Sequence, residues 1–497
     1  MQLFIQINLR LLFLLLLFTG GFQSYLYSQT KTDNVENFLS GKMRKRKIPG
    51  LQIAVIRHGK IVFLGAYGTA NIQNTVSVTN QTAFSINSAT KAFTGVAIMQ
   101  LVEDGKVELS APVSRYLDGL PTAWQLVTVR QLLTHVSGIP DVLIPAKGQG
   151  TGTLVGEGGE DSAWATIQTL PMEFKTGEKY RYNQTNYVLL GKIIDKLGGQ
   201  PFTEFIRERQ FKPVGMTNTA FGDSRDIVPR RAQAYRYFNG SLSVAPDTRL
   251  EHAFDEFTPF IRTAGGLNST AEEVARWIIS LQKGILLKES SLKMLWTNGT
   301  FNDGSPTPWA LGWSTNNRLE NPVAAGIGGR RSAFFVYPKD DLAIVILTNL
   351  AGANPEEFID DVAGYYIPNL RASNGGGLPA AIKLLRLELL KRGFENAPGM
   401  VIELKKKDAK FQLTEDDLNN WGGKLMEQEQ IKQAIEIFKL NVSLYPQSAN
   451  TYDSLAEAYD KSGNRELAIK NYWRSLELDS RNTNAIEHLK KLVPDLK

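Results

Sequence analysis

Apolar runs predict β-strands at both ends of a region that extends from Asn34 to Arg371. The segments Leu51–Ile56 (LQIAVI) and Lys60–Leu64 (KIVFL) are separated by Arg57-His58-Gly59, a spacing that is typical of a β-hairpin. Leu342–Leu347 (LAIVIL) is uniformly apolar, which indicates a buried strand. Helical segments with many Gly and Pro breaks lie between these strands. The pattern therefore predicts one sheet that is closed by N- and C-terminal pieces and covered by helices.

A short apolar run near the N-terminus, Arg10–Phe18 (RLLFLLLLF), begins with a positive charge. It is shorter than the roughly 18 apolar residues that a membrane span requires. We therefore interpret residues 1–28 as a secretory signal peptide, with a membrane anchor as the alternative. Cleavage sites with small residues are imperfect at both Thr19–Gly21 and Leu26–Ser28. No second run is comparably apolar, so we expect an exported protein, periplasmic or extracellular, without a transmembrane segment in its mature form.

A break in the sequence separates the large region from the C-terminal part of the chain. The glycine-rich segment Asn374–Gly377 (NGGG) predicts a flexible break, and a helical pattern follows over Pro379–Arg392. We interpret residues 372–413 as a linker that contains this helix. The remaining residues, 414–497, form a region of repeats.

Two consecutive segments of that region, Thr414–Gln447 and Ser448–Arg481, are each 34 residues long. Residues that match in register are Ala434 and Ala468, Ile435 and Ile469, Phe438 and Tyr472, and Leu444 and Leu478. A small residue with an aromatic residue four positions later lets two antiparallel helices approach closely. The pattern resembles tetratricopeptide repeats. Such helix pairs present a groove, so a protein or peptide partner is a possible role for this region, as is packing on the large domain.

Composition removes several classes of function. The chain has 497 residues and no cysteine, which excludes disulfides, thiol nucleophiles and cysteine zinc sites. Its four histidines show no metal-ligand spacing, so we expect no metal site and no organic cofactor. The 56 basic and 50 acidic residues give a net charge of +6, which is too weak and too dispersed to indicate nucleic-acid binding.

The segment that carries chemistry is Ser88-Ala89-Thr90-Lys91, followed by AFTGVAIMQLVEDGK. Ser88 and Lys91 are three residues apart, which places both side chains on one face of a helix. The small apolar residues that follow indicate that this helix is packed deep in the domain. Burial lowers the pKa of a lysine because it disfavours the ammonium form. The neutral amine can then accept the serine proton, so this nucleophile and base need no histidine.

Spacing alone proves little, because Ser-x-x-Lys occurs four times in the chain: Ser28–Lys31, Ser88–Lys91, Ser280–Lys283 and Ser290–Lys293. The first lies at the expected signal cleavage site, the third ends a helix just before Gly284, and the fourth is in a charged segment. Only Ser88 opens an apolar helix directly after a strand-like run.

With these residues, the chain resembles the serine β-lactamases and penicillin-binding proteins, specifically the class C-like branch that includes esterases and D-amino-acid peptidases. The resemblance covers about Asn34 to Asn369. The segments that carry it follow the order of the family: Ser88–Lys91 (SATK), Val129–Ile139 (VRQLLTHVSGI), Tyr182–Gln184 (YNQ), Pro213–Met216 (PVGM) and Ala264–Thr270 (AGGLNST).

The resemblance implies both a fold and a set of catalytic roles. The fold is an α/β (α+β) domain, residues 34–371, in which helices flank an antiparallel sheet beside an all-helical subdomain. Ser88 takes the position of the acylated nucleophile, and Lys91 and Tyr182 those of the residues that share base and acid roles. Gln184 stands where the family has Asn; it keeps the amide, is one methylene longer, and is expected to orient substrate.

The third motif of the family is Lys-Thr-Gly or His-x-Gly on a strand beside the site. The matching stretch here is Gly326–Phe334 (GIGGRRSAF), in which Ile327 stands where the cationic or imidazole residue belongs. N–H groups just after Gly329 are expected to complete an oxyanion hole with the Ser88 N–H. Arg330 or Arg331 could replace the missing substrate-binding charge; the alternative is that both are solvated charges at the strand edge.

Two other features resemble catalytic motifs without fitting them. Lys175-Thr176-Gly177 spells the third motif, but it precedes Tyr182, whereas the family places that motif after it. We interpret it as a turn that leads into the tyrosine segment. His135 lies beside Ser137, but no Gly-x-Ser-x-Gly elbow surrounds any serine, so we interpret His135 as a structural hydrogen-bonding residue.

Together these patterns predict an exported serine hydrolase that works through an acyl-enzyme and acts on esters, peptides or β-lactam-like amides. The changed third motif argues against an efficient β-lactamase, since that activity uses a carboxylate-binding residue there. The alternative function is a catalytically weakened, penicillin-binding-like protein that acts as a binding or scaffold module through its repeats. Ile327, Gln184 and the appended repeats motivate that alternative.

Overall fold

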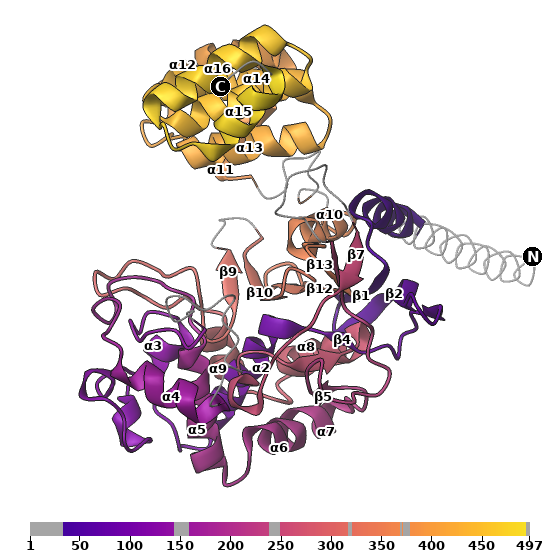
Figure 1. Ribbon diagram of the computed structural model, residues 1–497, viewed down its shortest axis with the longest axis vertical. Coiled ribbons are helices and arrows are strands. Elements are labelled where there is room, and N and C mark those ends of the chain that lie inside the picture. Colours follow the sequence, from indigo (N-terminus) through magenta and orange to yellow (C-terminus); the bar gives the residue numbers. More distant parts are fainter. Residues whose placement is uncertain are drawn as a thin grey trace, which may run out of the picture. The chain divides into compact units, whose positions relative to one another are not determined.

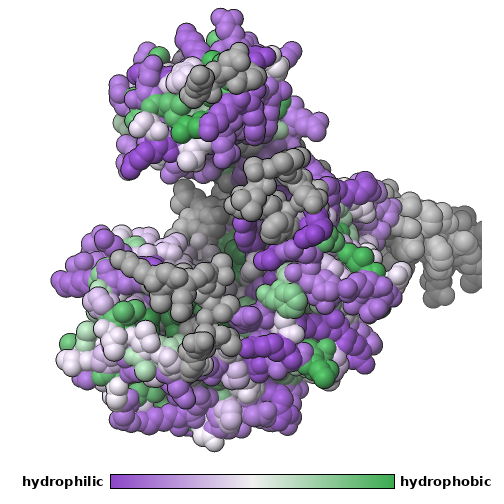
Figure 2. Space-filling model, viewed as in Figure 1, coloured by the Kyte–Doolittle hydropathy of each residue, from purple (hydrophilic) through white to green (hydrophobic). Residues whose placement is uncertain are grey.

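The computed structural model describes residues 33–143, 159–237, 249–316, 321–367, 370 and 378–493. The chain divides into two compact units, residues 1–367 and 368–497, and each is described by itself. The expected signal peptide, residues 1–28, lies outside the described residues. Within the described part of the chain, no helix is long and apolar enough to cross a membrane. In the view of Figure 2 the visible surface is mainly hydrophilic, with small hydrophobic patches on both units.

The first unit is built around a seven-stranded antiparallel sheet with the order β3-β2-β1-β12-β11-β10-β9 (Figure 1). Its strands are β1 (Gly50–Arg57), β2 (Lys60–Asn71), β3 (Val76–Ser77), β9 (Ser314–Asn316), β10 (Val323–Gly328), β11 (Ser332–Tyr337) and β12 (Leu342–Thr348). The predicted hairpin is β1–β2, and the predicted buried strand is β12. These two pair directly, with Ile53 opposite Ile346, so the N- and C-terminal pieces of the domain close the sheet as predicted.

Alternate residues of the sheet face two different layers of helices. Phe334 and Val345 point into the main core with α2 (Thr90–Glu103) and α8 (Ala271–Gln282). There Trp277 of α8 stacks on Phe93 of α2, with ring centroids 3.9 Å apart. On the opposite face, the Tyr337 hydroxyl donates a hydrogen bond to a carboxylate of α10 (Ile359–Ala363) at 2.7 Å. The sheet is therefore covered on both faces, as continuous apolar strands require.

Two small sheets and a group of helices complete the first unit. The small sheets have the orders β4-β8-β5 and β13-β6-β7. Their strands are β4 (Phe84–Ser85), β5 (Ala220–Phe221), β6 (Tyr235–Tyr237), β7 (Leu250–His252), β8 (Leu267–Ser269) and β13 (Leu350–Ala351). The helices are residues 33–46, α3 (Val129–Leu133), α4 (Gly159–Thr169), α5 (Thr185–Gly198), α6 (Phe202–Ile206), α7 (Lys212–Val214) and α9 (Glu289–Leu295). This arrangement confirms the predicted fold class.

The described part of the second unit is helical. Its helices are α11 (Ala380–Arg392), α12 (Ala397–Lys407), α13 (Glu415–Glu427), α14 (Ile431–Leu444), α15 (Ala449–Lys461), α16 (Arg465–Leu478) and α17 (Thr483–Leu492). Helix α11 matches the helical pattern after Pro379, whereas α12 had no clear signal in the sequence. Each 34-residue segment contains one antiparallel helix pair, α13–α14 and α15–α16.

Small residues allow these helix pairs to pack closely. Ala434 and Ala468 are fully buried, and Phe438 and Tyr472 lie in the same core. A Cβ atom on Gly422 of α13 would lie 2.4 Å from the Phe438 ring of α14, so the aromatic ring occupies the space that a side chain would need. This packing explains the spacing of small and aromatic residues in the sequence.

Candidate active site

A tight turn presents Ser88 at the start of α2. Strand β4 leads into the 3-10 turn η1 (Asn87–Ala89), which continues into the helix. Asn87 adopts φ +47° and accepts a hydrogen bond from the Ser85 hydroxyl at 2.5 Å, and its carbonyl accepts one from Thr90 at 2.6 Å. Asn87 and Ala89 are buried while Ser88 is half-buried. The turn therefore fixes the backbone and leaves the Ser88 hydroxyl accessible.

Lys91 lies one helical turn further along and is fully buried. Its Nζ donates hydrogen bonds to Gln184 Oε1 at 2.8 Å and to the Ala264 carbonyl at 2.7 Å. Burial lowers the pKa of Lys91 well below its ordinary value, and the Asp141 carboxylate opposes this in part. A neutral amine has two N–H bonds and one lone pair. The two acceptors use both N–H bonds, which leaves the lone pair free to take a proton.

Tyr182 lies beside the buried lysine. Its ring centroid is 4.6 Å from Lys91 Nζ. Burial raises the pKa of Tyr182, while hydrogen bonds from Ser88 and Gln184 lower it in part. The phenol is therefore neutral, and it lies close enough to the nucleophile for Ser88 to influence its pKa. The structure thus brings Ser88, Lys91, Tyr182 and Gln184 together, although no hydrogen bond joins Lys91 directly to Ser88 in the described part of the chain.

Asp141 is a member of this group that sequence reasoning missed. Its Oδ1 accepts hydrogen bonds from the backbone N–H of Gln184 at 3.2 Å and of Leu143 at 3.1 Å. Burial raises the pKa of Asp141, and its charge acts on both Lys91 and Tyr182. Asp141 follows Pro140 in an ordinary turn sequence, so no spacing in the chain connects it to the lysine.

His135 also lies close to the site, but as a hydrogen-bond acceptor. Its ring centroid is 4.6 Å from that of Tyr182, and its Nδ1 accepts from the Asn183 N–H at 3.1 Å. Burial lowers the pKa of His135 well below its ordinary value, with a further contribution from the charge of Lys91. A neutral imidazole whose acceptor nitrogen binds the backbone fits the structural role that we predicted for it.

The third-motif segment packs directly against the turn that carries Ser88. A Cβ atom on Gly328 would lie 1.8 Å from the Ile86 carbonyl oxygen, and one on Gly329 would lie 2.0 Å from Asn87 Nδ2. Gly329 also adopts φ +57°. Only glycine fits such approaches without displacing the turn. The two glycines thus bring the end of β10 into contact with the nucleophile segment.

One edge of β10 is open beside that contact. Strand β9 pairs only with Val323–Ala325, so Gly326–Gly328 have no strand partner on this edge in the described structure. After Gly329, the Arg331 N–H donates to the Gly328 carbonyl at 3.1 Å and closes the hairpin turn. That N–H is therefore not available to an oxyanion, and the open edge of β10 is the better source of a donor.

The two arginines of the hairpin do not supply a free charge. Arg331 is buried, and its Nη2 lies 2.7 Å from Asp255 Oδ1. Arg231 binds the same carboxylate at 3.3 Å. Arg330 is exposed and donates from Nε to Asn354 Oδ1 at 3.1 Å. In the described structure neither Arg330 nor Arg331 thus stands free to replace the side chain that is missing at Ile327.

The Lys-Thr-Gly sequence at residues 175–177 is a turn next to the tyrosine segment. Gly177 donates from its N–H to the Val136 carbonyl at 2.8 Å, and the Thr176 hydroxyl donates to the Ser137 carbonyl at 2.7 Å. The sequence resembles the third motif but forms no part of the strand beside Ser88. No group of three or more His, Cys, Asp or Glu side chains within the described residues could hold a metal ion.

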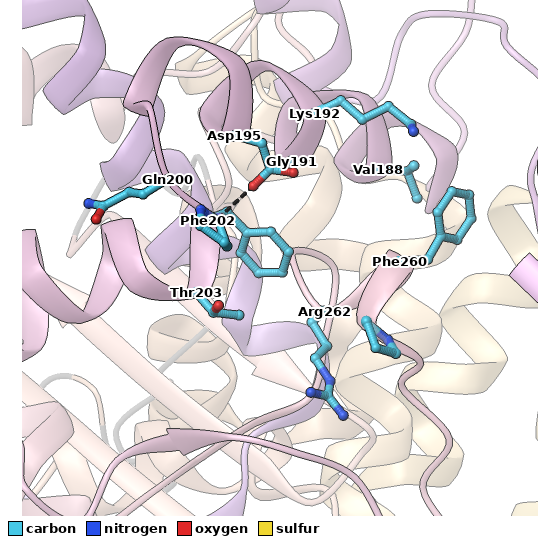
Figure 3. A pocket seen from close by; sticks show the side chains of 11 residues that line it. Val188, Gly191, Lys192, Asp195, Gln200, Phe202, Thr203, Phe260 and Arg262 are labelled. Atoms are coloured by element: carbon cyan, nitrogen blue, oxygen red, sulfur yellow. Dashed lines mark hydrogen bonds between the residues drawn. The ribbon is translucent and has the colours of Figure 1, made fainter.

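A cavity of about 550 Å³ lies in the helical part of the first unit (Figure 3). Residues of α5, including Lys192 and Asp195, line it together with Phe202 of α6 and Phe260 of η5 (Pro259–Ile261). The Asp195 carboxylate accepts a hydrogen bond from the Phe202 N–H, which fixes the start of α6. Neither the Ser88 group nor the third-motif segment Gly326–Phe334 contributes a residue to the lining of this cavity, so it is separate from the candidate active site.

The first unit of the chain is the part that matches known sequences. The sequence model of the family described as "Beta-lactamase" matches residues 35–365. The protein flp of Staphylococcus aureus (strain MW2) is 27% identical over 326 residues, which cover 64% of this chain and 62% of flp. The chain thus spans less than two thirds of the length of this curated relative.

Solved structures share the fold of the first unit. The octameric penicillin-binding protein homologue from Pyrococcus abyssi is 25% identical with a TM-score of 0.57, over 71% of this chain and 81% of that one. The D-amino acid amidase from Ochrobactrum anthropi SV3 is 24% identical with a TM-score of 0.55, over 68% of this chain and 99% of that one. The likeness to the amidase shows the fold alone.

Proposed function

Because the chain belongs to the beta-lactamase family, we propose that it is a serine hydrolase that transfers acyl groups through Ser88. The family is one of serine hydrolases, and the activity of this chain is our proposal. One observation carries it: the half-buried Ser88 and the neutral Tyr182 phenol lie beside a buried Lys91 amine whose two N–H bonds are taken by Gln184 and Ala264. These are the parts that an activated nucleophile requires.

Acylation moves one proton away from the serine. The Ser88 oxygen attacks the substrate carbonyl carbon, Tyr182 takes the serine proton, and it passes its own proton to Lys91. The carbonyl electrons move to the oxygen, which the Ser88 N–H and an N–H of the open Gly326–Gly328 edge stabilise. When the intermediate collapses, the Lys91 ammonium returns its proton to the leaving group. Water then releases the acyl group by the same steps in reverse.

The surroundings of β10 favour substrates without a carboxylate. Ile327 carries no charge, Arg331 is buried and shares the Asp255 carboxylate with Arg231, and Arg330 donates a hydrogen bond to Asn354. We therefore propose esters or amides, including D-amino-acid amides, as better substrates than β-lactams or peptides with a free C-terminus, whose carboxylate would have no cation to bind. No cofactor takes part in this scheme.

The test is a panel of substrates given to the full-length protein. The panel contains 4-nitrophenyl acetate, a D-alanyl-D-alanine peptide and a chromogenic cephalosporin, and each is compared between wild type and Ser88→Ala. We expect turnover of the ester, weak or no turnover of the peptide and the cephalosporin, which both carry a carboxylate, and loss of all activity in the variant. Ester turnover that is equal in both proteins would overturn the proposal.

We further propose that the protein is exported and that the helix pairs of residues 414–481 are tetratricopeptide-like. The apolar run at Arg10–Phe18 supports export, and the packing of Gly422 on Phe438 supports the repeat assignment. Expression of the full chain in a bacterial host, with cell fractionation and N-terminal sequencing, tests export. Retention of residues 1–28 in a cytoplasmic product would contradict it.

A further inference from the structure

A second cavity, of about 570 Å³, lies against the third-motif strand. Val323, Ala325 and Ile327 of β10 line it with Phe335 of β11. These are alternate residues of the strands, and the residues between them, such as Ala324, point into the main core. The cavity is therefore on the face of β10 that lies opposite the Ser88 turn, with Ile327 next in sequence to Gly328, whose backbone packs on that turn.

Both charged side chains that line this cavity are acidic, Glu356 and Asp360, and Asp360 already accepts a hydrogen bond from the Tyr337 hydroxyl at 2.7 Å. Glu356, in the turn η6 (Pro355–Glu357), lines the cavity, and its Oε2 is buried with no hydrogen-bond partner among the described residues. Burial raises the pKa of Glu356, while Arg330 and Arg46 lower it in part. Neither arginine pairs with it in the described structure: Arg330 binds Asn354, and Arg46 binds Glu357 at 2.8 Å.

Glu356 is half-buried, and the oxygen without a partner, Oε2, is buried. Beside the apolar residues of β10 and β11, this oxygen is best matched by a cation on a hydrocarbon chain, because the cation supplies the missing hydrogen-bond donor. The open Gly326–Gly328 edge of β10 contains both Ile327, which lines this cavity, and Gly328, which packs on the Ser88 turn. A substrate that lies along Gly326–Gly328 has the Ser88 turn on one face of the strand and the cavity on the other.

We propose that this cavity is a subsite of the Ser88 centre that takes the end of a substrate carrying an alkylammonium group, with Glu356 as its anionic partner. The inference rests on the proposed function. It reverses the charge preference that a cationic third motif would give, since β10 offers an apolar wall where a lysine would stand and η6 adds a carboxyl.

Competition against a neutral ester tests the subsite in the full-length protein. Hydrolysis of 4-nitrophenyl acetate is measured with hexylammonium, 1-heptanol or heptanoate as competitor, three chains of similar length that differ in charge. We expect hexylammonium to inhibit competitively, with an inhibition constant about tenfold or more below those of heptanol and heptanoate. A charge-assisted hydrogen bond to the carboxyl contributes a free energy of about that size. Glu356→Gln should remove this preference.

Glu357→Gln is the matched control, because Glu357 is the adjacent carboxylate and already pairs with Arg46. It should leave the preference for hexylammonium unchanged. The subsite would be overturned if the protein hydrolysed the ester but showed no preference for hexylammonium that depends on Glu356. It would also be overturned if hexylammonium bound in calorimetry without competing with the ester. If hexylammonium bound but the protein hydrolysed no ester, the proposed function would be overturned instead, and the subsite would fall with it.

Discussion

Replacement of Lys91 by methionine removes the buried amine and keeps a side chain of similar length and volume. The change deletes the two hydrogen bonds that Nζ donates, at 2.8 Å to Gln184 Oε1 and at 2.7 Å to the Ala264 carbonyl. Each buried acceptor left unpaired costs about 1–3 kcal/mol. The variant also avoids burying an amine, which offsets part of that cost. We therefore expect a folded protein whose stability changes by at most a few kcal/mol.

The effect on the reaction should be larger than the effect on the fold. General base catalysis contributes about 10²–10⁴-fold to rate, and each tenfold corresponds to about 1.4 kcal/mol of barrier. Lys91→Met should therefore slow acylation of Ser88 by about 10²–10⁴-fold, or about 2.7–5.4 kcal/mol. The assay is the time course of labelling by a fluorophosphonate probe, with circular dichroism to verify folding.

Lys192→Met is the matched control for this experiment. Lys192 lines the separate cavity of Figure 3, and its Nζ is 4.7 Å from the Trp164 ring centroid. Replacement of Lys192 should change the labelling rate by no more than about twofold, which is far less than the change expected when a general base is removed. If folded Lys91→Met were labelled as fast as wild type, Lys91 would not be the base and the reasoning would fail.

Three further variants test other parts of the account. Asp141→Asn removes the negative charge that raises the pKa of Lys91, so the acid limb of the pH profile of kcat/KM should move to lower pH. Gly328→Ala places a Cβ atom 1.8 Å from a backbone carbonyl of the nucleophile turn, and it should lower activity at least tenfold and stability by about 1–3 kcal/mol or more. Asp255→Asn leaves Arg331 without its carboxylate and should destabilise the fold by about 3–5 kcal/mol in urea unfolding.

Each of these expectations can fail. An acid limb of Asp141→Asn that stays in place or moves to higher pH would show that the carboxylate does not act on the base. Gly399→Ala in α12, where a Cβ atom meets nothing within 4 Å, is the control for Gly328→Ala and should keep full activity. Equal stability of Asp255→Asn and wild type would contradict the buried ion pair.

The strands were predictable because their apolar runs report burial directly. Leu51–Ile56 and Leu342–Leu347 are found in β1 and β12. That these two strands pair with each other is set by tertiary contacts between distant parts of the chain, which leave no local pattern. Helix α12 was missed because Pro398 and Gly399, which usually interrupt a helical pattern, stand in its first turn.

The candidate site was predictable where chemistry and spacing lie in one segment. Ser88 and Lys91 share a helical face, and the resemblance supplied Tyr182 and Gln184. Other contributors have no such signal. The Ala264 carbonyl binds Lys91 through its backbone, and Asp141 reaches the site only because the fold brings its turn to Gln184; the same holds for the Asp255 carboxylate that neutralises Arg331.

The most direct test asks which residue carries the acyl group. The full-length protein is mixed with a fluorophosphonate or a slowly deacylating ester, quenched in acid, digested and mapped by mass spectrometry. We predict one adduct per chain on the peptide that contains Ser88, and no adduct on Ser88→Ala. An adduct on any other residue, or none on a folded protein, would contradict the assignment of Ser88 as nucleophile.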